Sequence, residues 1–374
     1  MKVVVPVRHC YGHHLVFPRP FIERLERDTR FGPVEFVLDE RCAPVADAMP
    51  WFGSRNVRFV TFDLGGRAFA ELLEAEVGKG GVLFLPTLEE WVPDLARAHR
   101  RLAMADTPLV FGVCHYLRRR IVPATFRNAI RAAWQPLSLR LLRRSLRTPG
   151  LLPVAMSRRL VERWLPQDHE AFRFVPHPLQ GFAPVAPITE VSDRLLVFGS
   201  IRPDKRVEEI VDAVVQARAA GVAVRVQVVG RFEPAYGRRL RKLLDRPEVA
   251  AAVEFEDRFV SDAERIRMMR GALAVVLNYR GGDYRDGMQS GVLFDALALG
   301  AGVLAHADLE VPDEARTVRR FGVQPGDFTT AVRALLGSRS ERDERVRSVR
   351  AALLDRFESE TAALLDELAA ARVA

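Results

Sequence analysis

The segment Leu195–Arg206 reads LLVFGSIRPDKR, and this order of residue types predicts a β-strand, a tight turn and the start of a helix. The apolar run ends at Gly199, whose freedom at positive φ suits a sharp turn after a strand. Arg202 and Lys205 follow, three residues apart, before a helical pattern over 207–219. An arginine fork and a lysine point charge at such an edge suit a diphosphate. The alternative is a surface turn with solvated charges, which fits less well because Lys205 is one of only four lysines.

Short apolar runs alternate with longer amphipathic segments on both sides of this unit. The apolar runs predict strands at 3–7, 34–38, 57–62, 82–85, 109–113, 152–155, 195–198, 224–229, 253–255, 274–277 and 302–305. Helical patterns lie at 67–77, 92–104, 207–219, 262–269, 292–299 and 341–372. This alternation indicates right-handed βαβ units, and the nearly continuous apolar character of the strands indicates parallel sheets buried on both faces.

A proline-rich stretch over 175–188 interrupts the alternation and predicts an interdomain linker, because proline continues neither a helix nor a sheet ladder. The length of 374 residues suits two domains. We therefore expect an α/β fold with two Rossmann-like doubly wound domains, 1–180 and 181–340, facing across a cleft. A helical tail, 341–374, is expected to pack back toward the N-terminal domain. Such folds bind ligands at the carboxyl ends of their strands.

A second candidate binding segment is the helix that begins after Ser290 and stops at Gly300. Ser290 is a good N-cap, Gly291 allows a ligand to approach the backbone, and the amides up to Val292 favour an anion such as diphosphate. Asp295, about one and a half turns into the helix, could accept hydrogen bonds from ribose hydroxyls. The alternative is an ordinary capped core helix.

These segments, together with 226–232 (VQVVGRF) and 253–255, resemble the nucleotide-sugar domain of family 4 glycosyltransferases, the retaining GT-B enzymes related to glycogen synthase. The resemblance covers 195–305. It implies a GT-B fold and transfer of a sugar from a nucleotide-diphosphate donor, UDP- or GDP-linked, to a hydroxyl acceptor. It also implies retention of the anomeric configuration, no cofactor and no metal. The first domain would then bind the acceptor, and the second would bind the donor.

Two positions depart from the family pattern. Its second glutamate falls on Asp295, a shorter carboxylate, and its first falls on Gly287, which has no side chain. Asp283 and Asp286 are the nearby candidates to take over contacts to the donor sugar. These departures keep two alternatives open: a catalytically weak or silent sugar-nucleotide-binding partner protein, and another GT-B enzyme such as a nucleotide-sugar epimerase.

The resemblance is looser in the first domain. Gly12, in the loop Tyr11–His14, corresponds to a glycine-rich loop that lies beside the donor diphosphate, and His13 or His14 is a weaker candidate. His115 closes a strand, and the resemblance implies that it contacts the transferred sugar, as a histidine in this setting does in the family; the alternative is a structural histidine. For His177 a hinge role is the better interpretation. The expected catalytic residues are Arg202, Lys205 and His115, and the expected donor-binding residues are Gly12, Gly199, Arg231, Asp283, Asp286, Gly287, Ser290, Gly291, Val292 and Asp295.

The basic charge is concentrated in one segment, 107–161. It contains no acidic residue and eleven arginines, which exceed the whole net charge of +8. Apolar and aromatic residues interleave the arginines, a pattern typical of a surface that docks on anionic membranes. We expect a membrane or acceptor surface that includes Arg118, Arg119, Arg120, Arg127, Arg131, Trp134, Arg143 and Arg144. The alternative is a core-packed helix with solvated arginines, and nucleic acid ranks lower because no binding motif is present.

Composition excludes several other classes. With 48% hydrophobic and 28% charged residues, the chain has the composition of a globular protein. No run of 18 apolar residues and no secretory signal is visible, so we expect a cytoplasmic protein or one peripheral on the inner membrane face. Cys10, Cys42 and Cys114 match neither a disulfide framework nor a metal-binding spacing.

The expected acceptor is a lipid-linked saccharide or glycolipid of bacterial envelope or exopolysaccharide synthesis.

Overall fold

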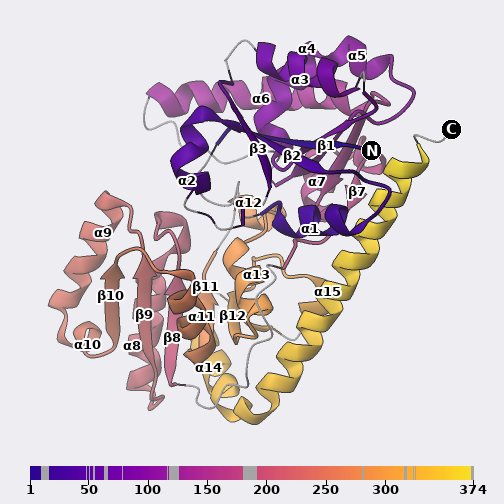
Figure 1. The fold of residues 1–374 in the computed structure, drawn as a ribbon. Helices are drawn as coiled ribbons and strands as arrows, with labels where there is room; N and C mark the ends of the chain where they lie inside the picture. Colours follow the sequence, from indigo (N-terminus) through magenta and orange to yellow (C-terminus); the bar gives the residue numbers. More distant parts are fainter. Residues whose placement is uncertain are drawn as a thin grey trace. The chain divides into compact units, whose positions relative to one another are not determined.

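The computed structural model describes residues 1–9, 17–47, 49, 51–53, 55–62, 66–77, 79–115, 117, 126–179, 192–279, 282–315, 318–322, 324 and 326–371. The chain forms two compact units (Figure 1). Unit 1 comprises Met1–Pro178 with Arg356–Ala374, and unit 2 comprises Leu179–Asp355. The long helix α15, Arg339–Ala370, contributes to both. Most of the predicted linker lies outside the described residues.

Unit 1 is built on a seven-stranded parallel sheet with the order β3-β2-β1-β4-β5-β6-β7. The strands are β1 Val3–Val7, β2 Val34–Asp39, β3 Asn56–Val60, β4 Val82–Leu85, β5 Val110–Cys114, β6 Leu151–Ala155 and β7 Arg173–Phe174. The order reverses direction between β1 and β4, which is the doubly wound arrangement of Rossmann-like domains. The pairing of Val3 with both Val34 and Val82 places β1 at this reversal.

Helices cover both faces of this sheet, so its central strands are buried throughout. Along β1, Val3, Val5 and Val7 belong to one core and Val4 belongs to the other. The helices of unit 1 are α1 Arg19–Arg27, α2 Ala43–Asp47, α3 Arg67–Val77, α4 Val92–Arg97, α5 His99–Ala103, α6 Phe126–Leu146 and α7 Arg158–Trp164. The end of α15 completes the unit: Phe357, Leu364, Leu365 and Leu368 join the first core, and Arg173 forms a two-point ion pair with Glu367 at 2.5 and 2.6 Å.

Unit 2 repeats the plan with six parallel strands in the order β10-β9-β8-β11-β12-β13. They are β8 Arg194–Phe198, β9 Arg225–Gly230, β10 Val253–Asp257, β11 Ala274–Leu277, β12 Val303–His306 and β13 Arg319–Phe321. The helices are α8 Val207–Ala219, α9 Pro234–Arg241, α10 Pro247–Ala250, α11 Asp262–Gly271, α12 Gly282–Arg285, α13 Gly291–Ala298 and α14 Asp327–Gly337. The order reverses between β8 and β11, so ligand binding is expected at the carboxyl ends of these two strands.

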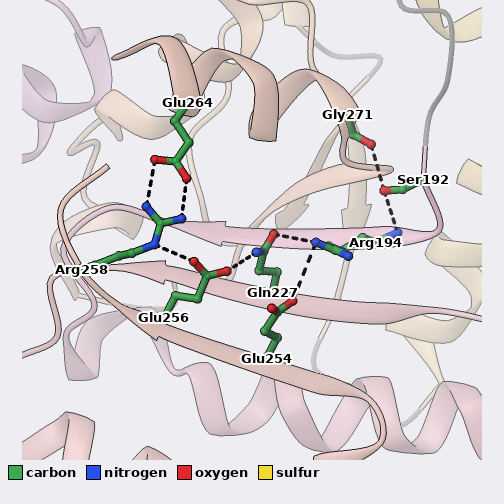
Figure 2. Close-up of polar contacts among 8 residues, drawn as sticks. All are labelled: Ser192, Arg194, Gln227, Glu254, Glu256, Arg258, Glu264 and Gly271. Atoms are coloured by element: carbon green, nitrogen blue, oxygen red, sulfur yellow. Dashed lines mark hydrogen bonds and ion pairs between the residues drawn. The ribbon is translucent and has the colours of Figure 1, made fainter. Parts of the chain in front are cut away.

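One face of the β8–β9–β10 edge is polar, as Figure 2 shows. Gln227, buried in the middle of β9, accepts from Arg194 Nη1 at 3.2 Å and donates to Glu256. Arg258 then joins Glu256 of the edge strand to Glu264 of α11, with two contacts to Glu264 at 2.9 and 2.5 Å. Charged side chains on an edge strand also disfavour pairing with another chain.

The expected α/β fold with two doubly wound domains is confirmed. Every predicted strand corresponds to an observed one, and the predicted helices 67–77 and 207–219 have the observed bounds. The predicted helix 92–104 is wrong as a single element, because α4 ends at Arg97 and α5 begins at His99. The short outer strands β7 and β13 were not predicted.

The expectation about cysteines was wrong for Cys42, which is buried and disulfide-bonded, whereas Cys114 is a free buried thiol. Spacing along the chain carries no information on which loops the sheet order brings together, so it could not predict this bond.

Candidate functional site

Two glycine turns shape the carboxyl edge of unit 2. Gly199 follows β8 with φ +99°, and Gly230 ends β9 with φ +144°. A Cβ on Gly230 would lie 1.8 Å from the carbonyl oxygen of Gly199. The two backbones therefore approach as closely as only glycine permits, because the Gly199 carbonyl occupies the position where a side chain of residue 230 would otherwise stand.

Lys205 lies beneath this turn and is only 5% exposed. Its Nζ donates to the carbonyl oxygen of Phe198 at 2.5 Å and lies 5.4 Å from the centroid of the Tyr279 ring. Within the described part of the chain, no carboxylate forms an ion pair with it. A buried ammonium is costly to leave without a counter-charge, so this environment favours an anion.

The lysine and the start of α13 face the same point. A Cβ built on Gly199 would lie 3.6 Å from Lys205 Nζ and 3.5 Å from Val292 Cγ2. Ser290, the buried N-cap residue of α13, accepts the amides of Leu293 and Phe294 on its carbonyl oxygen. The first amides of any helix lack intrahelical acceptors, and nothing lies within 4 Å of a Cβ built on Gly291. The ammonium of Lys205 and the first turn of α13, through the Val292 side chain, thus both lie next to Gly199, and the surroundings of Gly291 are open.

Arg202 and Arg231 lie near this edge but are more exposed. Arg202 Nη2 forms an ion pair with Asp204 Oδ2 at 3.0 Å. Arg231 uses its backbone for structure, because its carbonyl oxygen accepts from the amide of Ile201 at 2.8 Å, while its side chain is exposed. Both guanidinium groups can contribute charge, whereas Lys205 is the cation that the fold holds in place.

Asp295 is engaged by another residue. Its Oδ2 accepts from Arg265 Nη1 of α11 at 3.0 Å, and Arg265 also pairs with Asp262. Burial raises the pKa of the Asp295 carboxyl to about 6, although the Arg265 charge acts in the opposite direction. The expected contact of Asp295 with a ribose stays a prediction, and this contact would compete with the Arg265 pair.

The remaining donor-binding candidates lie between β11 and α13. Gly287 has φ +100°, and its amide donates to Tyr284 at 3.3 Å, so the missing glutamate is replaced by a turn that favours glycine. Asp286 is half-buried. The side chain of Asp283 lies outside the described residues.

Sequence reasoning missed three residues of this edge: Arg206, Asn278 and Tyr279. Arg206 has a left-handed backbone, and Asn278 and Tyr279 directly follow β11. The signal in the sequence was the position of Asn278, a polar residue directly after the predicted strand 274–277.

In unit 1, His115 follows β5 at the carboxyl edge of the sheet. Its Nε2 lies 2.7 Å from the carbonyl oxygen of Pro86, so Nε2 carries the proton, and its ring meets Phe17 edge-on at a centroid distance of 4.2 Å. Phe17 also contacts His177, at 5.4 Å. These contacts position His115, and its contact with a sugar stays a prediction. Gly12, with His13 and His14, lies outside the described residues.

The arginine-rich segment, 107–161, contains β5, α6, β6 and the start of α7. Arg118, Arg119 and Arg120 lie outside the described residues, as do the side chains of Arg127, Arg131 and Trp134. Farther along, Arg143 and Arg147 share the buried carboxylate of Asp168, at 3.5 and 3.2 Å, so part of the charge is neutralised by a later segment. Leu142 and Leu146 pack in the core, and Leu137, Arg140, Arg144 and Arg147 are exposed at helical spacing.

Two further observations concern membranes and metals. No described helix combines the length and apolar character needed to cross a bilayer. In the ranges that the structure describes, no three His, Cys, Asp or Glu side chains are grouped so that they could hold a metal ion.

Comparisons with known proteins identify the fold. No protein-family model and no curated protein matches the sequence. The chain is similar over 99% of its length to the whole of Anabaena Alr3699/HepE in complex with UDP, with TM-score 0.65 and 14% identity. It is also similar to a glycosyltransferase from Rickettsia africae; the match covers 100% of this chain and 98% of that one, with TM-score 0.67 and 10% identity. A third match is WaaG, a glycosyltransferase involved in lipopolysaccharide biosynthesis; it covers 98% of this chain and 99% of that one, with TM-score 0.58 and 13% identity. Together with the two parallel sheets, this likeness shows that the chain has the GT-B fold.

Proposed function

We propose that the chain is a retaining, family 4-like glycosyltransferase that moves a sugar from a nucleotide-diphosphate donor to a hydroxyl acceptor. The observation that carries this proposal is Lys205, a buried ammonium beside the Gly199 turn and close to the first turn of α13. The structures of Alr3699/HepE in complex with UDP and with UDP-glucose support a nucleotide-sugar ligand for this fold.

The proposed chemistry is stabilisation of the departing diphosphate. Negative charge grows on the diphosphate as the bond to the sugar breaks, and Lys205 with the amides of Gly291 and Val292 would neutralise it. Arg202, exposed beside them, would add a second cation. Lys205 and the amides are fixed by the fold before the donor arrives, so little reorganisation of these groups accompanies the reaction. His115 would contact the transferred sugar, and no metal ion is required.

The acceptor is proposed to be a lipid-linked saccharide or glycolipid of envelope or exopolysaccharide synthesis, reached from the inner membrane face. The exposed stripe of α6, Leu137 with Arg140 and Arg144, would contact anionic headgroups. Flotation tests this: recovery with anionic liposomes should exceed recovery with neutral ones and should fall with salt. The pair Arg140→Glu and Arg144→Glu should abolish it, whereas Arg238→Glu in α9 should not. Equal recovery with both liposomes would refute the membrane surface.

The central experiment measures binding and turnover separately. Thermal shifts with UDP and GDP should identify the nucleotide, and slow hydrolysis of the matching UDP- or GDP-sugar should show turnover. Lys205→Ala should lose both, whereas Lys242→Ala, at an exposed lysine of the same unit, should keep both. Full affinity and turnover in Lys205→Ala would overturn the proposed role.

A second candidate function is binding without catalysis. It is favoured by Gly287, which offers no carboxylate, and by Asp295, whose carboxylate is held by Arg265. Tight nucleotide-sugar binding with no hydrolysis and no transfer to any acceptor would select it.

A further inference from the structure

The residue after Lys205 has an unusual backbone. Arg206 has φ 46° and ψ 51°, and it is the one non-glycine residue with positive φ in the part of the chain that the structure describes. The left-handed region is unfavourable for a residue with a Cβ, and it persists where surrounding groups hold it. Because Arg206 joins the turn Pro203–Lys205 to α8, its dihedral angles set the direction of the turn that carries Lys205 relative to the helix.

A buried side chain from a distant strand holds this conformation. Asn278, 3% exposed, donates from Nδ2 to the carbonyl oxygen of Arg206 at 3.2 Å and to Glu209 Oε2 at 3.1 Å. Two acceptors define the orientation of its amide. Glu209 returns to the same residue, accepting from Arg206 Nη1 at 2.9 Å and donating its amide to the Arg206 carbonyl at 3.1 Å. Arg206, Glu209 and Asn278 therefore form one closed cluster.

The next residue of that strand end contacts Lys205 itself. Tyr279 places its ring centroid 5.4 Å from Lys205 Nζ, within cation–π range. Its ring is buried and stacked on Tyr284 with centroids 4.3 Å apart, so it has little freedom to turn away. Since β11 pairs directly with β8, its carboxyl end lies beside the turn that carries Lys205.

We infer that Asn278 and Tyr279 are positioning residues for the phosphate-binding lysine: Asn278 holds the left-handed turn at Arg206, and Tyr279 orients the ammonium. This inference rests on the proposed function for the identity of the ligand, but the placement of Lys205 is a property of the free protein.

The test compares Asn278→Ala and Asn278→Asp with wild type by calorimetric titration of UDP and UMP. Asn278→Asp keeps the shape of the side chain but replaces the donor by an acceptor beside two oxygens. We expect both variants to bind UDP about tenfold more weakly, with a smaller change for UMP, because the loss concerns the lysine that binds the diphosphate. Arg258→Ala, outside the cluster, controls for general destabilisation and should leave the ratio of UDP to UMP affinities unchanged.

Glycine provides the rescue. In an Arg206→Gly background the turn no longer needs to be held, so Asn278→Ala should cost less UDP affinity than it costs in the wild-type background. An equal cost in both backgrounds, or an unchanged ratio of UDP to UMP affinities, would overturn the inference.

A crystal structure of ligand-free Asn278→Ala separates this inference from the proposed function. We expect Arg206 to leave positive φ and Lys205 Nζ to leave the Phe198 carbonyl. Retention of both would overturn the positioning role whatever the protein binds. Failure of wild type to bind UDP or GDP would instead overturn the proposed function and the assignment of the ligand.

Discussion

Replacing Lys205 by methionine should weaken nucleotide binding without lowering the stability of the free protein. The ammonium attracts the diphosphate, but its burial costs free energy when no ligand is bound. In the free protein the charge is buried, with one carbonyl acceptor, one ring face and no carboxylate partner in the described ranges. Methionine has a similar volume and no charge to desolvate. Replacing a buried ion pair by apolar side chains of similar size is often neutral or stabilising by about 1 to 4 kcal/mol, and a charge without a carboxylate partner has less attraction to lose. We therefore expect the urea midpoint of unfolding of free Lys205→Met to be equal to or above that of wild type.

The loss of affinity should be large. Two unit charges 4 Å apart attract by about 4 kcal/mol at an effective dielectric constant of 20. Part of this attraction is offset by desolvating the diphosphate, which leaves about 2 to 3 kcal/mol. That difference corresponds to roughly 30- to 150-fold weaker binding.

The assay is urea unfolding of both proteins without ligand, together with calorimetric titration of UDP and GDP. Lys242→Met, at an exposed lysine of the same unit, is the control and should change neither measurement. A variant that unfolds at markedly lower urea, or one that keeps wild-type affinity, would refute the reasoning. The first result would mean that the ammonium stabilises the fold, and the second that it does not face the ligand.

Three further predictions concern unit 2. Burial raises the pKa of the Asp295 carboxyl to about 6, so the folded state binds the carboxyl proton more tightly than the unfolded state. The stability that this protonation contributes is therefore complete below about pH 4 and is lost as the pH rises through 6. Wild type should therefore lose about 2 to 3 kcal/mol relative to Asp295→Asn between pH 4 and 7 in urea titrations, and parallel pH profiles would contradict this. Gly230→Ala should cost about 3 kcal/mol or more, because its Cβ would overlap the neighbouring carbonyl at a strained φ; an unchanged urea midpoint would exclude the close approach. Arg258→Ala should lower the urea midpoint slightly by breaking its partly exposed contacts with Glu264, measured against the exposed control Arg238→Ala, and equal midpoints of the two variants would show that the network adds nothing.

Much of the fold could be predicted because it is encoded locally. Runs such as 3–7 and 82–85 are apolar at every or nearly every position, and this pattern is typical of strands that are buried on both faces of a sheet. The helices 67–77 and 207–219 have clear apolar periodicity and were predicted at their observed bounds. The strands β7 and β13 have two and three residues, too few for a pattern to emerge.

The candidate site could be predicted only in part. Gly199 and Lys205 follow a strong strand signal, so their place at a carboxyl edge was evident from the sequence. The ion pair that engages the Asp295 carboxylate was not evident from the sequence, because its partner Arg265 lies 30 residues earlier on another helix. The same holds for Asp168, which neutralises part of the arginine-rich segment from outside it.

The sequence by itself determined the alternation of strands and helices, the division into two doubly wound sheets, and the placing of Lys205 after a glycine turn. These properties depend on periodicity and on backbone preferences, which act over a few residues. Only the tertiary structure decided that Lys205 is buried without a carboxylate partner among the described residues, and that Asn278, 72 residues away, binds the carbonyl of Arg206. The reason is the sheet order: β11 becomes the neighbour of β8, and side chains that are remote in the chain then share one low-dielectric environment in which each charge and hydrogen bond depends on the others.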